Sequence, residues 1–204
     1  PPGTTLEPGE RVVVYQAQFA NETRLSNNGE RITLVDAAGL IIQDFSYNDN
    51  NPWPGSADGH GFSLVRIAPS ADGDANLGIE WRPSVADGGS PAQSDSVPFT
   101  GNQPEELISH ALPLPASHIN AQVSQDGKLS IAIRRKLASD DIAFSFDYSA
   151  DMRAWQEITP GSGMEIASRN NHGDGTETLV FRAGDISPAD GKRTMAVRVR
   201  VNLR

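Results

Sequence analysis

The chain has 204 residues, of which 37% are hydrophobic, and it carries a formal net charge of −9. It contains no cysteine, which excludes disulfides and thiolate metal sites. No apolar run approaches the ~20 residues that a membrane-spanning helix requires. The 19 glycines and 14 prolines favour an all-β chain of short strands and frequent turns.

The negative charge is concentrated in the first half. Residues 1–104 carry 13 acidic side chains against 5 arginines, a net −8, whereas residues 105–204 carry 13 against 12 basic ones, a net −1. Because an acidic surface repels phosphate backbones, we expect no nucleic-acid partner. Most basic residues near the C-terminus alternate with apolar ones, which is typical of the solvated face of a strand.

The first half predicts four strands separated by glycine-containing turns. Asn27-Asn28-Gly29 and Ala38-Gly39 are the turn signals, because Asn and Gly tolerate a positive φ. The β-branched and alternating runs around them predict strands at Glu10–Tyr15, Ile32–Asp36, Leu40–Tyr47 and Phe62–Ile67.

The second half predicts six more strands after a polar connecting segment. Residues 92–117 are rich in Pro, Ser, Gln and Asn, with a short helix expected at Glu105–Ala111. We expect strands at Ile119–Val123, Leu129–Arg135, Ile142–Tyr148, Met164–Ser168, Thr178–Arg182 and Thr194–Val201. In the third and the last of these runs, apolar residues recur at every second position, which excludes a helix there.

Several short motifs of the first half follow one another in a fixed order. They are an Asn-Gly-Glu turn at residues 28–30, Trp53-Pro54, Asp58-Gly59 and Gly61 ahead of Ser63-Leu64, and Trp81-x-x-Ser84 before Gly88-Gly89-Ser90-Pro91. With this order and spacing, residues 3–92 resemble the lamin tail domain in its bacterial form. The resemblance implies an immunoglobulin-like β-sandwich, with Trp53 and Trp81 as apolar anchors of a thin core and Gly59 and Gly61 in turns.

One difference from the family pattern concerns the start of the chain. Family members carry strands before a Pro-Gly-Thr-x-Leu-x-Pro-Gly-Glu passage, which here occupies residues 2–10. We therefore expect an N-terminally truncated sandwich with an exposed sheet edge, satisfied by a partner chain or by loss of order. Pro1 is not a native start, so we also expect an export signal to lie outside this sequence.

The second half carries a looser resemblance. Phe146-Asp147-Tyr148-Ser149-x-Asp151-Met152-x-x-Trp155 is similar to the β-rich C-terminal modules of large exported bacterial proteins. It implies an immunoglobulin- or fibronectin-like β-sandwich. The expected organisation is a lamin-tail-like sandwich at residues 1–92, a linker at 93–117 and a C-terminal sandwich at 118–204.

Two oxygen-rich loops are candidates for a calcium site, because hard cations prefer carboxylate and amide oxygens. The candidate ligands are Asp49, Asp58, Asp72, Asp74 and Asn76. The segment from Asp72 departs from an EF-hand loop, whose sixth and twelfth positions are held here by Leu77 and Pro83. We therefore favour solvated Asx turns in both loops, and no cofactor other than this calcium alternative is expected.

The sequence predicts no catalytic centre. The four histidines lie in separate loops without metal-ligand spacing, and His60, although it lies near Asp58 and Ser63, is not accompanied by a nucleophile elbow. We expect a non-enzymatic, exported or cell-surface bacterial fragment that serves adhesion, positioning or contact with a protein partner or with the rest of its parent chain. The alternative is a carbohydrate-binding module that presents an exposed tryptophan to a glycan, with Trp155 as the candidate.

Overall fold

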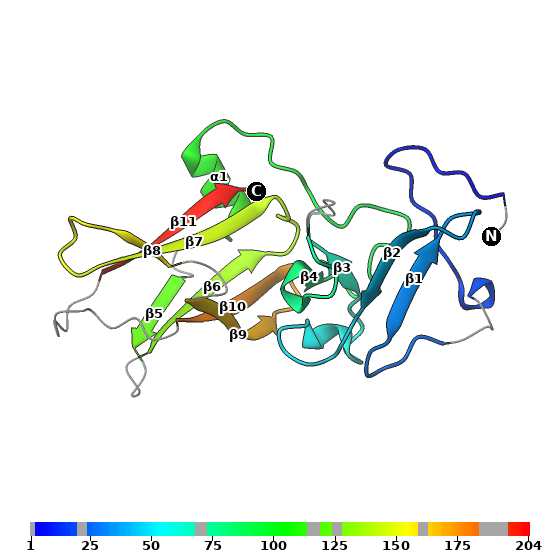
Figure 1. The fold of residues 1–204 in the computed structure, drawn as a ribbon. Helices are drawn as coiled ribbons and strands as arrows, with labels where there is room; N and C mark the ends of the chain where they lie inside the picture. The colour runs from blue at the N-terminus through cyan, green and yellow to red at the C-terminus, as the bar shows by residue number, and fades with distance from the viewer. Residues whose placement is uncertain are drawn as a thin grey trace. The chain divides into compact units, whose positions relative to one another are not determined.

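The computed structural model describes residues 3–19, 24–67, 73–113, 119–123, 128–158, 163–183 and 196–204 (Figure 1). Among these residues the fold is all-β apart from one short helix and three 3₁₀ turns, at Gln16–Gln18, Gly55–Ala57 and Gly78–Glu80. The chain divides into two compact units, unit 1 (Pro1–Asp95) and unit 2 (Ser96–Arg204).

Unit 1 contains two antiparallel ribbons. β1 (Arg31–Val35) pairs with β2 (Ile41–Ser46), and β3 (Leu64–Arg66) pairs with β4 (Trp81–Pro83). In the β1–β2 hairpin, Ile32 lies opposite Phe45, so both side chains project from the same face. Gly39 has a φ of 84° in the connecting turn, as the sequence predicts for a tight hairpin.

The run Glu10–Tyr15 was predicted to be a strand, and this prediction is wrong. Residues 11–15 are described and belong to no strand, and Val12, Val14 and Tyr15 are exposed. The β-branched run favours an extended backbone, but a strand also requires a partner ladder, and no strand of the described part of unit 1 pairs with this run. The β-propensity of this run is therefore not sufficient to make it a strand.

The core of unit 1 is small. Among its described residues, the buried apolar side chains are Trp53, Pro54, Ile67, Ala75 and Pro83. Large apolar side chains instead remain exposed at one end of the β1–β2 hairpin, namely Leu34, Val35, Leu40, Ile41 and Ile42, of which the last three are 68%, 62% and 61% exposed. Exposed apolar patches of this kind mark interaction surfaces in soluble proteins.

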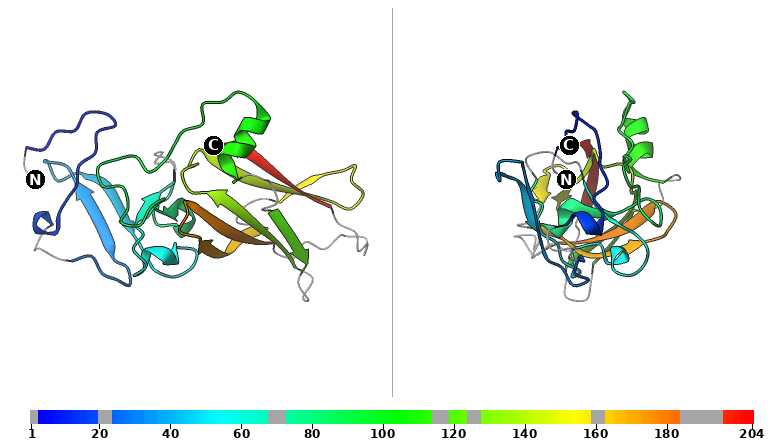
Figure 2. Two further views of the ribbon diagram at one scale, coloured as in Figure 1. Left: turned by 180° about the vertical axis from the view of Figure 1, so that it is seen from behind. Right: turned by 90° about the vertical axis from the view of Figure 1, so that its right-hand side faces the viewer.

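Unit 2 contains a four-stranded and a three-stranded antiparallel sheet (Figures 1 and 2). The first has the order β5-β6-β10-β9, from β5 (Ile119–Val123), β6 (Leu129–Lys136), β9 (Met164–Asn171) and β10 (Thr176–Ala183). The second has the order β11-β7-β8, from β7 (Ile142–Ser149), β8 (Gln156–Ile158) and β11 (Ala196–Leu203). The sequence missed the three-residue strands β4 and β8, which are too short to show alternation.

Both sheets of unit 2 contribute to one apolar cluster. In β6, buried and half-buried residues alternate strictly, and Ile131 and Ile133 are fully buried. Phe146 of β7 packs against Phe181 of β10 with ring centroids 4.9 Å apart. The cluster is completed by the buried residues Ala111, Leu112, Leu129, Ile142, Ile158, Met164 and Ala183.

Helix α1 (Pro104–Ala111) belongs to unit 2 and contacts β11 and β6. Pro104 suits the first helical position, and Glu106 Oε2 accepts hydrogen bonds from Asn102 N at 2.9 Å and Gln103 N at 3.1 Å, which caps the first turn. Lys136 Nζ donates to the carbonyl of Ser109 at 2.6 Å, and His110 Nε2 lies 2.9 Å from Asp141 Oδ1. The segment expected as a linker, residues 93–117, thus includes a helix that packs on the core of unit 2.

Candidate functional site

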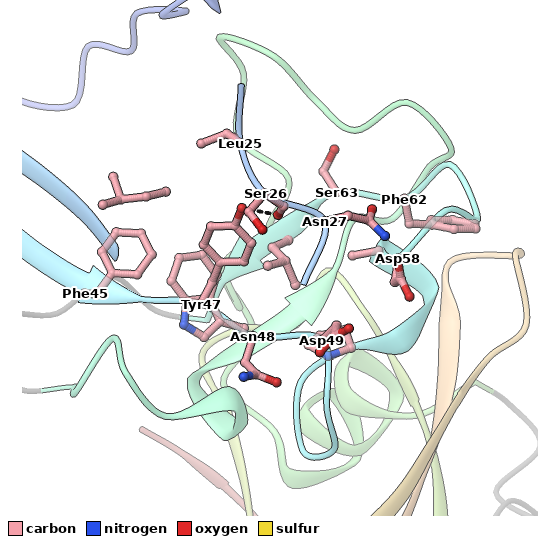
Figure 3. Close-up of a pocket in the computed structure, with 15 residues that line it drawn as sticks. Leu25, Ser26, Asn27, Phe45, Tyr47, Asn48, Asp49, Asp58, Phe62 and Ser63 are labelled. Carbon is pink, nitrogen blue, oxygen red and sulfur yellow. Dashed lines mark hydrogen bonds between the residues drawn. The ribbon is translucent and has the colours of Figure 1, made fainter. Parts of the chain in front are cut away.

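Unit 1 has a groove of about 470 Å³ between its two ribbons (Figure 3). We call it the aromatic groove. Its lining comes from β1 to β4 and from the loops that flank them, namely Leu25, Ser26, Asn27, Ile32, Phe45, Tyr47, Asn48, Asp49, Pro54, Ala57, Asp58, Phe62, Ser63, Leu64 and Trp81. Its volume lies within the range of ordinary ligand pockets, which are also mostly apolar with a few polar groups.

The turn at Asn27-Asn28-Gly29 places one wall of the groove, formed by residues 25–27, against Tyr47. Gly29 has a φ of 105°, and a Cβ at this position would lie 2.4 Å from the carbonyl oxygen of Tyr47, so only glycine fits. The amide of Tyr47 donates to the carbonyl of Glu30 at 3.1 Å and extends the hairpin by one bond. The turn that the sequence predicted therefore positions one wall of the site.

The phenol of Tyr47 is held by a small network. Its hydroxyl donates to the carbonyl of Ser26 and lies 3.2 Å from Glu30 Oε1, which also accepts from the amide of Ser26 at 2.7 Å. Burial of the hydroxyl, followed by the charge and hydrogen bond of Glu30, raises the pKa of Tyr47 to about 12. The ring is therefore neutral and fixed in the groove wall (Figure 3).

The floor of the groove is aromatic. The ring centroid of Trp81 lies 5.2 Å from that of Phe45 and 5.7 Å from that of Trp53. Trp81 Nε1 donates to the carbonyl of Ala75 at 2.9 Å, which satisfies its polar atom. Trp53 is only 7% exposed, whereas Trp81 is half-buried and presents part of its ring to the groove.

Two carboxylates lie in the groove wall without a cationic partner. Asp49 follows β2, and Asp58 follows the 3₁₀ turn at Gly55–Ala57 (Figure 3). Neither carboxylate makes a hydrogen bond or an ion pair in the described part of the chain, and no Lys, Arg or His lines the groove. The groove thus combines an aromatic floor with uncompensated negative charge.

The segment that follows β4 is tied back to unit 1 by a buried ion pair. Arg82 is fully buried, and its Nη1 donates to Asp95 Oδ1 at 2.6 Å. The same carboxylate accepts from Val85 N at 2.9 Å and from Ser90 Oγ at 2.5 Å. Burial alone raises the pKa of Asp95, but the hydrogen bonds from Ser90, Arg82 and Val85 outweigh it and hold that pKa below its ordinary value.

The serines and glycines of the motif that the sequence shares with the lamin tail pattern also have structural roles in unit 1. Ser84 is buried, its amide donates to the carbonyl of Ser63 at 2.8 Å, and its hydroxyl accepts from the amide of Ser63 at 3.0 Å. Gly59 and Gly61 have φ values of 73° and 84° in the loop before β3, and a Cβ on Gly61 would lie 2.0 Å from Asp87 Oδ1. The motif residues therefore position the wall of the groove that Asp58, Phe62 and Ser63 form.

The calcium candidates are distributed over two places. Asp49 and Asp58 line the groove, whereas Asp74 Oδ1 accepts from the amide and the side chain of Asn76, at 2.9 and 2.8 Å. Asn76 Oδ1 accepts in turn from Ser46 N at 2.9 Å. These bonds lower the pKa of Asp74 and form an Asx turn, which fits a structural loop better than a calcium ligand set. Asp72 lies outside the described residues.

No cluster of three or more His, Asp or Glu side chains able to hold a metal occurs among the residues that the structure describes. His60 is exposed and makes no hydrogen bond to Asp58 or Ser63 in that same part of the chain. His118 lies outside the described residues. The superficial Ser/His/Asp set of the sequence is therefore not assembled as a hydrogen-bonded triad.

Trp155 lies in unit 2, after β7. It is half-buried, and the guanidinium of Arg198 lies over its ring, 4.5 Å from the ring centroid. Arg198 is itself held by Asp147, whose Oδ2 accepts from Nε at 2.9 Å. One face of the indole is thus covered by a cation–π contact, which leaves less of the ring for stacking on a sugar.

The sequence missed most of the groove. Leu25, Tyr47, Asn48 and Phe62 line it, yet none was singled out as a site residue. The available signal was the period-two relation of Phe45 and Tyr47, which places both rings on one face of the hairpin.

Comparisons with protein-family models, with curated proteins and with solved structures return no match. The resemblance to the lamin tail domain, and the export and surface location that it implies, therefore stay predictions. Among the described residues, no helix has the length and hydrophobicity needed to cross a bilayer.

Proposed function

We propose that the chain is a non-catalytic pair of β-sandwich modules from a larger exported bacterial protein, and that it serves protein contact through unit 1. The aromatic groove is the observation that supports this proposal most directly. It offers Phe45, Tyr47 and Trp81 to a ligand, and unit 1 exposes further apolar side chains on its hairpin. Aromatic residues are enriched at protein interfaces because they bury much area at low entropic cost.

The strand arrangement of unit 2 supports the sandwich assignment. The orders β5-β6-β10-β9 and β11-β7-β8 correspond to the A-B-E-D and F-C-C′ sheets of an immunoglobulin-like domain. The apolar residues of the two sheets pack into a single cluster, as expected for two facing layers. Such modules commonly act as rigid carriers for a binding surface.

An extended peptide is the ligand form that suits unit 1. In the described part of the chain, β1 and β2 pair only with each other, so each keeps one open edge. A strand added to such an edge gains main-chain hydrogen bonds, while a neighbouring pocket takes one of its side chains.

A titration with two ligand panels tests the proposal. One panel contains extended five- to nine-residue peptides rich in Val and Thr, and the other contains soluble neutral glycans. We expect saturable heats and a change in tryptophan fluorescence with peptides, weakened severalfold by Phe62→Ala and unaffected by Tyr15→Ala, which lies outside the groove. Binding of glycans but of no peptide, abolished by Trp155→Ala, would overturn the proposal in favour of a carbohydrate-binding module.

A further inference from the structure

We propose that the aromatic groove takes a basic side chain, a lysine of a partner protein segment, between its aromatic floor and the carboxylates of Asp49 and Asp58. The inference rests on the proposed function, because it names the chemistry of the partner at the same site.

The charge of unit 1 supports a basic partner. Residues 1–95 carry 13 acidic side chains and 5 arginines, a net −8. Three of these arginines are already engaged: Arg31 with Asp44, Arg82 with Asp95, and Arg66 with the carbonyl of Gly73. A cationic segment is therefore attracted to unit 1 as a whole, and an acidic one is repelled.

The local charge of the groove points the same way. Asp49 is half-buried, and its carboxylate and that of Asp58 make no hydrogen bond or ion pair in the described part of the chain. This contrasts with Asp44, whose pKa is lowered to about 2, first by its hydrogen bond from Arg31 and then by that from Thr33. The two carboxylates belong to different loops of the groove wall and accept no hydrogen bond in the described part of the chain, whereas an incoming ammonium brings three N–H donors.

The apolar part of the groove suits the stem of a lysine. The side chain of lysine packs its four methylene groups on apolar surface and keeps its charge at the polar rim. Phe45 and Trp81 supply that surface, and Tyr47 supplies a fixed, neutral ring beside the acidic wall. A cation over such rings gains a further cation–π attraction. A neutral apolar side chain would gain the stem contacts but leave the carboxylates without a cation.

The test uses three peptides that differ at one position. Acetylated and amidated Thr-Val-X-Val-Thr is titrated into the full chain with X as lysine, norleucine or glutamate, and binding is measured by calorimetry. Norleucine keeps the alkyl stem and removes the charge. From one exposed cation–π contact and one or two exposed charge pairs, we expect lysine to bind about five- to twentyfold more tightly than norleucine, and glutamate least tightly.

Charge-neutral variants locate the effect. Asp49→Asn and Asp58→Asn should each weaken the lysine peptide about two- to fivefold and leave norleucine binding unchanged. Glu7→Gln removes the same charge from an exposed position outside the groove and should have little effect. Neither groove carboxylate has a hydrogen bond to lose in the described structure, so the melting temperature of these variants should match that of the unaltered chain, which separates binding from folding.

The outcomes separate the inference from the proposal beneath it. Equal binding of the lysine and norleucine peptides, or an effect of Glu7→Gln as large as that of Asp58→Asn, would overturn the lysine pocket while leaving a peptide-binding groove. Absence of binding by every peptide would overturn the proposed function itself, and the lysine pocket with it.

Discussion

The buried pair of Arg82 and Asp95 gives the sharpest stability prediction. Replacing Asp95 with alanine removes the acceptor for three donors, Arg82 Nη1, Val85 N and Ser90 Oγ, at 2.6, 2.9 and 2.5 Å. Arg82 is fully buried and would lose its bonded carboxylate while keeping its bond to the carbonyl of Pro83 at 3.0 Å. Breaking a buried ion pair from one side costs about 3–5 kcal/mol, a large share of the roughly 5–15 kcal/mol that stabilise a domain.

The assay is urea denaturation followed by tryptophan fluorescence in a Trp155→Phe background. In that background the remaining tryptophans, Trp53 and Trp81, both belong to unit 1. We expect Asp95→Ala to lower the unfolding free energy of unit 1 by about 3–5 kcal/mol, and Asp95→Asn to lower it less because its side chain keeps an oxygen acceptor. The exposed control Asp87→Ala should change it by less than about 0.5 kcal/mol.

The ion pair of Arg82 and Asp95 also makes the stability of unit 1 depend on pH. Because the pKa of Asp95 in the folded chain lies below its unfolded value of about 3.9, its stabilisation is present above that value and is lost as the pH falls through the folded pKa. Asp95→Asn should remove this acid sensitivity. A loss below about 1 kcal/mol for Asp95→Ala would refute the reasoning, since it would mean that the guanidinium of Arg82 is not dependent on this carboxylate.

Three further predictions concern other parts of the chain. Glu177→Ala should destabilise unit 2 by about 3–5 kcal/mol, measured by thermal unfolding, because Arg135 Nε and Nη2 donate to the buried carboxylate at 2.8 and 2.6 Å; a change within 1 kcal/mol would contradict this. Ultraviolet titration should show a phenol with a pKa of about 12 that is absent in Tyr47→Phe. Because this pKa is raised from about 10, the contribution of Tyr47 to the stability of the folded chain should be lost as the pH rises from about 10 to 12. A pKa of Tyr47 near 10 would contradict the buried network. Millimolar calcium should leave the melting temperature unchanged, and a rise that is abolished by Asp58→Ala or Asp74→Ala would show that these loops bind the ion after all.

Strands β6 and β7 of unit 2 could be predicted because their apolar side chains recur at every second residue. In β6 and β7 each inward position is apolar until the end of the strand, so the pattern is visible without any structure. The exception is informative: Arg135 occupies an inward position and is buried, because Glu177 on the neighbouring strand pairs with it. A partner 42 residues away leaves no local signal in the sequence.

Unit 1 was harder to predict, because its small core depends on contacts between loops. The turn at Asn27-Asn28-Gly29 was visible, but its contact with Tyr47 depends on how the chain returns after β2. Likewise, Asp49 and Asp58 were singled out as oxygen donors for calcium, whereas the structure places both in the wall of an aromatic groove. The sequence shows that Asp49 and Asp58 offer carboxylate oxygens. Only the folded structure shows that both carboxylates line the same groove as the aromatic rings.

We propose the aromatic groove of unit 1 as the contact site. Chemical-shift mapping of the ¹⁵N-labelled chain during titration with the lysine peptide tests it most directly. We predict progressive shifts at the amides of Tyr47, Asn48 and Asp58 and at the indole N–H of Trp81, with unit 2 unchanged. Shifts confined to Trp155 and its neighbours in unit 2, or no shifts at peptide concentrations that saturate the calorimetric signal, would contradict it.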